Sequence, residues 1–295
     1  MKRRFAAALA AALALVALPA LAEPVTVVAT FTILGDMVRQ IGGDEVAVTT
    51  LVGPDGDAHV YEPTPADARA LGAAKLVVVN GLGMEGWIDR LVKASGYKGP
   101  VTVTSAGITP IAGEEEHGGH DPHAWQSVAN AKLYADNILK GLIAVDPAKA
   151  DALRANHAAY RAKLDAVEAE IKAALAPIPR KDRKIVTSHD AFGYYGKAYG
   201  VTFLAPVGLS TDAEASAGDI ARMIRQIKKE KIKAVFVETI ADPRLLEQIT
   251  RETGARIGGR VYSDALSAAG GPASTYIGMM RHNLAQFTKA LAPAS

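Results

Sequence analysis

The chain has 295 residues, of which 49% are hydrophobic and 22% are charged, and its formal net charge is +2. This composition excludes a disordered chain, and the length is sufficient for one large or two medium domains. The small net charge gives no reason to expect nucleic acid as a partner. The sequence contains no cysteine, which excludes disulfides, thiolate metal sites and cysteine nucleophiles.

The first 22 residues have the composition of a secretory signal peptide. Three basic residues near the start precede an apolar run over residues 5–18, and residues 20–22 (Ala-Leu-Ala) fit the small-x-small cleavage rule. Fourteen apolar residues are too few to span ~30 Å of hydrocarbon, which argues against the alternative, an uncleaved membrane anchor. We therefore expect cleavage after Ala22 and localisation of the exported chain in the periplasm.

From residue 23 onward, short apolar and β-branched runs alternate with segments of helical periodicity. In the first half we predict strands over residues 25–30, 46–52, 76–79 and 101–104, and helices over residues 33–41, 65–71 and 87–93. In the second half we predict strands over residues 184–187, 201–204 and 234–237, and helices over residues 191–199, 216–230, 243–253 and 274–291. This alternation favours the α/β class, with two lobes that each contain a mainly parallel sheet.

Residues 147–176 predict one long helix between the two halves. Apolar positions recur there at steps of three and four from Leu153 to Leu175, and Pro177 ends the pattern. Such a helix would be about 45 Å long. We therefore expect a signal peptide (1–22), an N-terminal lobe (23–146), a linking helix (147–176) and a C-terminal lobe (177–295). A helical link resists bending, so we expect the lobes to move little relative to each other.

Four side chains lie where a ligand site is expected. His59 and His189 follow predicted strands, His123 precedes a helix, and Asp264 follows the apolar stretch 257–261. Ligands of open α/β sheets bind beyond the carboxyl ends of the strands, so we expect these groups, two from each half, in the cleft between the lobes. Three imidazoles and one carboxylate suit tetrahedral Zn²⁺. Their spacings of 64, 66 and 75 residues form no local motif, so the residues alone leave this ligand set open.

The sequence around these histidines resembles the cluster A-I solute-binding proteins, the zinc and manganese receptors of ABC importers. The resemblance rests on residues 56–65 (GDAHVYEPTP), 121–125 (DPHAW), 188–194 (SHDAFGY), 208–214 (GLSTDAE) and 276–280 (YIGMM). It extends over essentially the whole mature chain and implies two α/β lobes joined by one long rigid helix, with the metal site in the interlobe cleft. It also implies a receptor without enzymatic activity and an ABC permease as partner. By this resemblance the four metal ligands are His59, His123, His189 and Asp264.

The third ligand position bears on the choice of metal. Manganese receptors of this family commonly carry Glu there, whereas this chain has His189, and a nitrogen-rich set favours Zn²⁺ over Mn²⁺. We therefore expect a high-affinity periplasmic Zn²⁺ receptor, with a manganese or iron receptor of the same family as the alternative. We expect a monomer, and a metallochaperone that loads the site is a further candidate partner.

Two functions outside the metal receptors are weaker alternatives. A periplasmic zinc hydrolase would use the three histidines as ligands and Asp264 as general base, but no H-E-x-x-H motif supports it. A haem or siderophore receptor would share the long-helix architecture, but only Trp87 and Trp125 could line its wide cleft with indole rings.

Further polar groups allow two interpretations each. Residues 114–120 (EEEHGGH) occupy the place where zinc receptors of the family often carry a longer His-rich insertion. They form either a loop that captures zinc or a solvated acidic turn. Carboxylates near the ligands could accept the second imidazole N–H or cap turns; these are Asp57, Asp121, Asp190 and Glu238. His157 and His282 lie in helical patterns, and we expect them to be structural or at the surface.

Overall fold

The computed structural model describes residues 23–113 and 119–292, so the predicted signal peptide and residues 114–118 lie outside the described residues. The first four strands form one sheet in the order β2-β1-β3-β4. Their bounds are Val25–Phe31 (β1), Val46–Val52 (β2), Leu76–Val79 (β3) and Val101–Val103 (β4). Every pair is parallel. The central strands are buried, because helices cover them, and this explains their continuous runs of valine.

The second sheet repeats this arrangement in the order β6-β5-β7-β8. Its strands are Lys184–Val186 (β5), Thr202–Leu204 (β6), Ala234–Glu238 (β7) and Arg256–Val261 (β8), and all its pairs are parallel. We call each sheet with its helices a lobe. The two parallel sheets confirm the predicted α/β class, whereas the lobe boundaries at residues 146 and 177 stay predictions.

Four helices belong to the N-terminal lobe. They are α1 (Thr32–Gly42), α2 (Pro65–Gly72), α3 (Ile88–Ser95) and α4 (Val128–Val145). Helix α2 begins at a capping box, in which the Thr64 side chain accepts from the backbone of Asp67 and the Asp67 side chain accepts from the backbone of Thr64. For helix α4 the sequence analysis predicts no bounds, and for strand β8 it notes only the apolar stretch 257–261.

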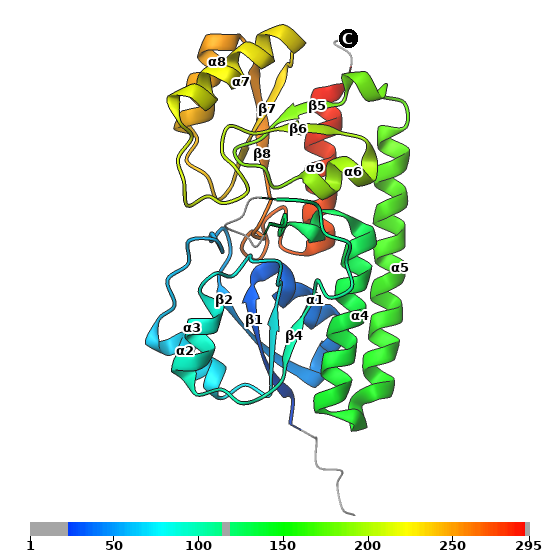
Figure 1. The fold of residues 1–295 in the computed structure, drawn as a ribbon. Helices are drawn as coiled ribbons and strands as arrows, with labels where there is room; N and C mark the ends of the chain where they lie inside the picture. The colour runs from blue at the N-terminus through cyan, green and yellow to red at the C-terminus, as the bar shows by residue number, and fades with distance from the viewer. Residues whose placement is uncertain (1–22, 114–118, 293–295) are drawn as a thin grey trace, which may run out of the picture.

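Helix α5 (Ala150–Leu175) is the predicted long helix, and Figure 1 shows it beside α4, running along both lobes. Its apolar stripe is buried as expected, at Leu153, Tyr160, Leu164, Val167, Ile171 and Leu175. It begins later than predicted, because Pro147–Lys149 forms a 3₁₀ turn in which the Lys149 amide donates to the carbonyl of Asp146.

The C-terminal lobe contains α6 (Gly193–Tyr199), α7 (Ala217–Glu230), α8 (Arg244–Thr253) and the last helix, α9 (Tyr276–Leu291). Helix α9 packs against α5 and also against α1 of the N-terminal lobe. At its first turn the Tyr276 amide donates to the buried carboxylate of Asp36 on α1, at 2.8 Å. The last helix is therefore fastened to both lobes.

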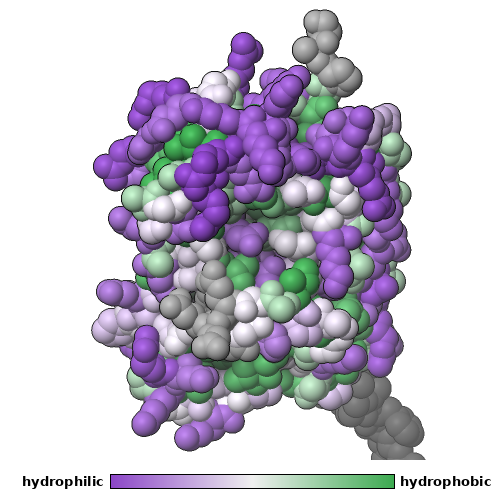
Figure 2. Space-filling model, turned by 45° about the horizontal axis from the view of Figure 1, so that its top comes forward, coloured by the Kyte–Doolittle hydropathy of each residue, from purple (hydrophilic) through white to green (hydrophobic). Residues whose placement is uncertain are grey.

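One apolar core runs through both lobes, from Leu34 and Val78 to Phe192, Phe236 and Phe287. A second, smaller core lies between the sheet of the C-terminal lobe and helices α7 and α8. Hydrophilic side chains cover most of the C-terminal lobe in Figure 2, while paler and hydrophobic residues gather in the band between the lobes. Within residues 23–113 and 119–292, no helix combines the length and the apolar character that a membrane span requires.

Candidate metal centre

The structure brings all four predicted ligands together. The cluster consists of His59, His123, His189 and Asp264, all buried, and each offers an atom that lies within 4.8 Å of those of the other three. The Nε2 atom of His123 lies 3.2 Å from Nε2 of His59 and 3.4 Å from Nε2 of His189. The carboxylate oxygens of Asp264 lie 3.1–3.7 Å from the three Nε2 atoms.

The parallel topology of the sheets determines where the loops that carry these groups lie. His59 lies after β2, His189 after β5 and Asp264 after β8, while His123 directly precedes the 3₁₀ turn Ala124–Gln126. Because the carboxyl ends of parallel strands meet at one edge of a sheet, the two lobes present these loops to each other.

The loop of Asp264 follows a strand of the C-terminal lobe but is held by the N-terminal lobe. Trp125 Nε1 and Gln126 Nε2 both donate to the carbonyl oxygen of Ser263, at 2.9 and 2.8 Å. The Leu266 amide donates to Thr32 Oγ1 at 2.8 Å. The four groups are still divided two to each half of the chain, but the loop of Asp264 is held by the N-terminal lobe as well as by its own.

Two of the carboxylates considered from the sequence orient the imidazoles. Asp121 Oδ1 lies 2.9 Å from Nδ1 of His123 and accepts the His123 amide at 2.9 Å. Glu238 Oε2 lies 2.6 Å from Nδ1 of His189, and Glu238 Oε1 accepts the His189 amide at 2.9 Å. The His189–Glu238 contact is a close ion pair rather than a well-aligned hydrogen bond. A carboxylate at Nδ1 favours a proton there, so Nε2 is the atom that each ring offers to a metal ion.

The other two acidic residues make different contacts. The Asp57 carboxylate accepts the amide of His59 at 2.9 Å, which caps the turn before His59. The amide of Asp190 donates to the carbonyl of Gly208 at 3.0 Å.

Burial and mutual charge set the protonation of the cluster. Burial alone would raise the pKa of Asp264, but the neighbouring charges of His189 and His123 hold that pKa well below its usual range. Burial lowers the pKa of His59. Burial also opposes a charge on His189, yet Glu238 and Asp264 together raise its pKa well above the usual value. The Asp264 carboxylate is therefore ionised and faces nitrogen atoms for which protons and a metal ion would compete.

A tetrahedral zinc ion fits this donor set. Four ligand atoms about 2.0 Å from Zn²⁺ lie about 3.3 Å apart, and the contacts given above span 3.1–3.7 Å. Among the residues that the structure describes, no donor of good geometry satisfies either buried oxygen of Asp264. A cation between these groups would satisfy the carboxylate and separate the closely spaced nitrogen atoms.

The remaining described histidines lie outside the cluster. His157 on α5 lies 2.8 Å from Asp136 Oδ1 on α4, and Nε2 of His282 lies 3.0 Å from the carbonyl of Arg260. Both are structural or at the surface, as expected. His120 pairs with Ala112 in an isolated β-bridge, and His117 lies outside the described residues.

Comparison with known proteins identifies the family. The model of the family described as "Zinc-uptake complex component A periplasmic" matches residues 27–290. The chain belongs to this family. It is therefore the substrate-binding component of an ABC metal importer, and not an enzyme, which confirms the resemblance found in the sequence.

Relatives of the chain carry the names of different metals. It is 36% identical over 270 residues to a "Manganese-binding lipoprotein MntA" of Halalkalibacterium halodurans, covering 91% of this chain and 89% of that one. It is 35% identical over 261 residues to an "Iron-binding protein YfeA" of Yersinia pestis, covering 88% and 84%. The structure of the "periplasmic zinc binding protein TroA" from Treponema pallidum matches with a TM-score of 0.87 at 30% identity, covering 92% and 100%. The two-lobed fold is therefore that of a metal receptor.

The sequence analysis did not identify the residues that hold the Asp264 loop. Trp125 and Gln126 lie two and three positions after His123, and this closeness to a candidate ligand is a signal present in the sequence. Nothing local in the sequence indicates that they reach Ser263, because that contact joins residues more than a hundred positions apart.

Proposed function

We propose that this chain is a periplasmic Zn²⁺ receptor that binds one ion with His59, His123, His189 and Asp264 and delivers it to the permease of its importer. The observation that carries this proposal is the approach of three imidazole Nε2 atoms and one ionised carboxylate to a common centre. Their separations suit tetrahedral coordination, which zinc prefers in proteins.

The donor chemistry favours zinc over the metals named in several relatives. Manganese and iron are supported by the names of the relatives given above, so family membership alone does not select the ion. Mn²⁺ prefers carboxylate and water oxygens, whereas imidazoles suit Zn²⁺, which also stands above Mn²⁺ in the Irving–Williams order. His189 supplies the nitrogen atom that shifts this preference.

A receptor also explains the number of protein ligands. Four protein ligands fill a tetrahedral zinc site, whereas a catalytic zinc keeps one position open for water. The hydrolase alternative would need Asp264 to act as a base beside the ion. Its carboxylate instead lies within 3.7 Å of all three Nε2 atoms, as a fourth ligand would.

Capture follows from the preset protonation of the site. Asp121 and Glu238 lie at the Nδ1 atoms of His123 and His189, so Nε2 is the atom that each ring offers to the incoming ion. Because the pKa of His189 is raised, its Nε2 proton must leave as the ion binds. The ionised Asp264 attracts the cation. The predicted signal peptide supports export to the periplasm, where the chain would act as a monomer and dock on its permease. Loading by a metallochaperone remains a proposal.

Competitive metal titration tests the proposal. Protein stripped with a chelator and titrated with Zn²⁺ and Mn²⁺ against a fluorescent chelator should bind one Zn²⁺ per chain tightly and Mn²⁺ far more weakly. Alanine at His189 should abolish the tight zinc site, while alanine at His282 serves as the matched control on a surface histidine. Equal affinity for the two metals contradicts the assignment to zinc.

A further inference from the structure

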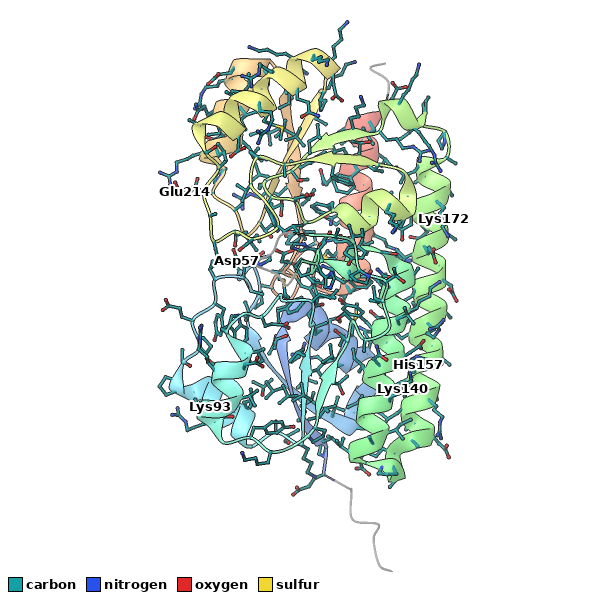
Figure 3. The ribbon with its side chains drawn as sticks, viewed as in Figure 1. Asp57, Lys93, Lys140, His157, Lys172 and Glu214 are labelled. Carbon is teal, nitrogen blue, oxygen red and sulfur yellow. The ribbon has the colours of Figure 1, made fainter. Side chains whose placement is uncertain are left out.

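A hydrogen bond joins the loop of His59 in the N-terminal lobe to the β6–α7 loop of the C-terminal lobe. Thr211 Oγ1, on the loop between β6 and α7, donates to Asp57 Oδ2, on the loop between β2 and α2, at 2.7 Å. Both residues are half-buried. Figure 3 shows Asp57 at the boundary between the lobes, on the side away from α5, with Glu214 of the β6–α7 loop above it. The contact therefore bridges the lobes on the side opposite the linking helix.

The Asp57 carboxylate connects this bridge to a ligand. Its second oxygen, Oδ1, accepts the backbone N–H of His59 at 2.9 Å. The carbonyl of Ala58, the residue before His59, accepts from Trp87 Nε1 at 2.9 Å, so the ligand loop is held on both sides. A displacement of the Asp57 carboxylate therefore also moves the backbone of His59.

The other end of the bridge is connected to His189. The β6–α7 loop pairs with the His189 segment through a bridge between His189 and Val207, and the amide of Asp190 donates to the carbonyl of Gly208. Thr211 lies three residues farther along this loop. One continuous path therefore leads from His189 in the C-terminal lobe, through Thr211 and Asp57, to His59 in the N-terminal lobe.

The opposite side of the interface is fixed by several contacts. The Tyr194 hydroxyl of α6 donates to the carbonyl of Asp121, and the Val128 amide donates to the Tyr199 hydroxyl. Helix α5 and the shared apolar core lie along the same side. Any separation of the lobes therefore opens on the side of Asp57 and Thr211, and breaking their bond is part of that movement.

We propose that the Thr211–Asp57 hydrogen bond is a latch that limits the rate at which the bound metal leaves the site. The proposal rests on the proposed metal-binding function. Thr211 and Asp57 act as positioning residues, since neither belongs to the four-ligand set. A hydrogen bond to an ionised acceptor is stronger than one between neutral groups. Half-burial reduces this difference for the Thr211–Asp57 bond. Its loss should therefore accelerate release about tenfold.

Metal release into excess chelator tests the latch. Zinc-loaded protein is mixed with a chromogenic chelator in a stopped-flow instrument, and the release rate and the zinc stoichiometry are measured together. Thr211→Val removes the hydroxyl at nearly constant volume and should release zinc about ten times faster, with one zinc still bound per chain. Thr211→Ser keeps the hydroxyl and should restore the rate of the unaltered protein. Thr250→Val on α8 is the matched control, because its hydroxyl donates within its own helix.

The results of these measurements distinguish a failure of the latch proposal from a failure of the proposed zinc binding. Failure of the unaltered protein to bind zinc overturns the proposed function. Normal zinc binding with a release rate within twofold of the unaltered protein in Thr211→Val overturns the latch alone, as does equal acceleration by Thr250→Val. If Thr211→Val does not fold, Asp57→Asn replaces it. This variant keeps one oxygen acceptor for the His59 amide and replaces Oδ2 by an NH2 group, which cannot accept the Thr211 hydroxyl. An unchanged release rate there also overturns the latch.

Discussion

Replacing Gln126 by leucine should weaken metal binding while leaving the stability of the metal-free protein nearly unchanged. Gln126 is fully buried, and its Nε2 donates to the Ser263 carbonyl beside Asp264 at 2.8 Å. Its Oε1 has no hydrogen-bond partner among the residues that the structure describes. Leucine has a similar size, so the substitution removes one useful donor together with one buried and unsatisfied acceptor.

The two effects on stability are opposite in sign and similar in size. Loss of the hydrogen bond costs about 1 kcal/mol, and removal of an unsatisfied buried acceptor returns about 1–3 kcal/mol. Unfolding of the metal-free protein should therefore shift by no more than about 1–2 kcal/mol, and in the stabilising direction if it shifts at all. The Asp264 loop keeps only the Trp125 donor at Ser263, and this looser loop should weaken zinc affinity about three- to tenfold.

Two measurements on the same samples decide this prediction. Competitive titration with a fluorescent chelator gives the zinc affinity, and chemical denaturation after chelator treatment gives the free energy of unfolding. Gln248→Leu on the exposed face of α8 is the matched control and should leave both unchanged. An unchanged affinity combined with a clear loss of stability would show that Gln126 only supports the fold, and that the Asp264 loop does not depend on it.

Three further predictions test neighbouring parts of the molecule. Glu238→Gln should weaken zinc binding about 10- to 100-fold in competitive titration, because an amide N–H facing Nδ1 of His189 moves the ring proton to Nε2; Glu252→Gln on α8 is the control. Deletion of residues 114–120 should leave the equilibrium affinity unchanged and slow loading at low free zinc, whereas loss of the tight site would mean that a primary ligand lies in this loop. Burial raises the pKa of Glu85, so its carboxyl holds a proton more readily when folded, and stability should fall as the pH rises above about 4.5. In denaturation at several pH values, Glu85→Gln should have a flatter profile, and parallel profiles would contradict this.

The sequence predicts the bounds of an element best where one clear residue pattern defines that element. Strands β2 and β3 have the predicted bounds, because runs of valine and threonine between polar residues define both ends. Helix α4 received no bounds, and its buried face explains why. That face places the small residues Ala131 and Ala135 beside larger ones such as Ile138 and Leu142, so small side chains interrupt the apolar stripe.

The candidate ligands could be predicted only from sequence context. Spacings of more than sixty residues carry no local information, so the resemblance of the surrounding segments singled out these histidines from the others. Asp121 and Glu238 could be proposed as second partners of the imidazoles but not chosen over Asp57 and Asp190. That choice depends on which oxygen faces Nδ1, and side-chain orientation in a loop is set by tertiary packing.

The way the lobes share the four ligands suggests how a rigid receptor can still release its cargo. Among the four candidate ligands, Asp264 follows β8 of the C-terminal lobe but is also held by the N-terminal lobe through Ser263, whereas His189 is positioned by the C-terminal lobe through Glu238. Helix α5 and the common core keep the lobes in contact along one side. A small separation on the side of Asp57 and Thr211 would then displace His189 from the other three ligands and open a coordination position. A large hinge movement is unnecessary, because the loss of one ligand already converts a closed tetrahedral site into an exchangeable one.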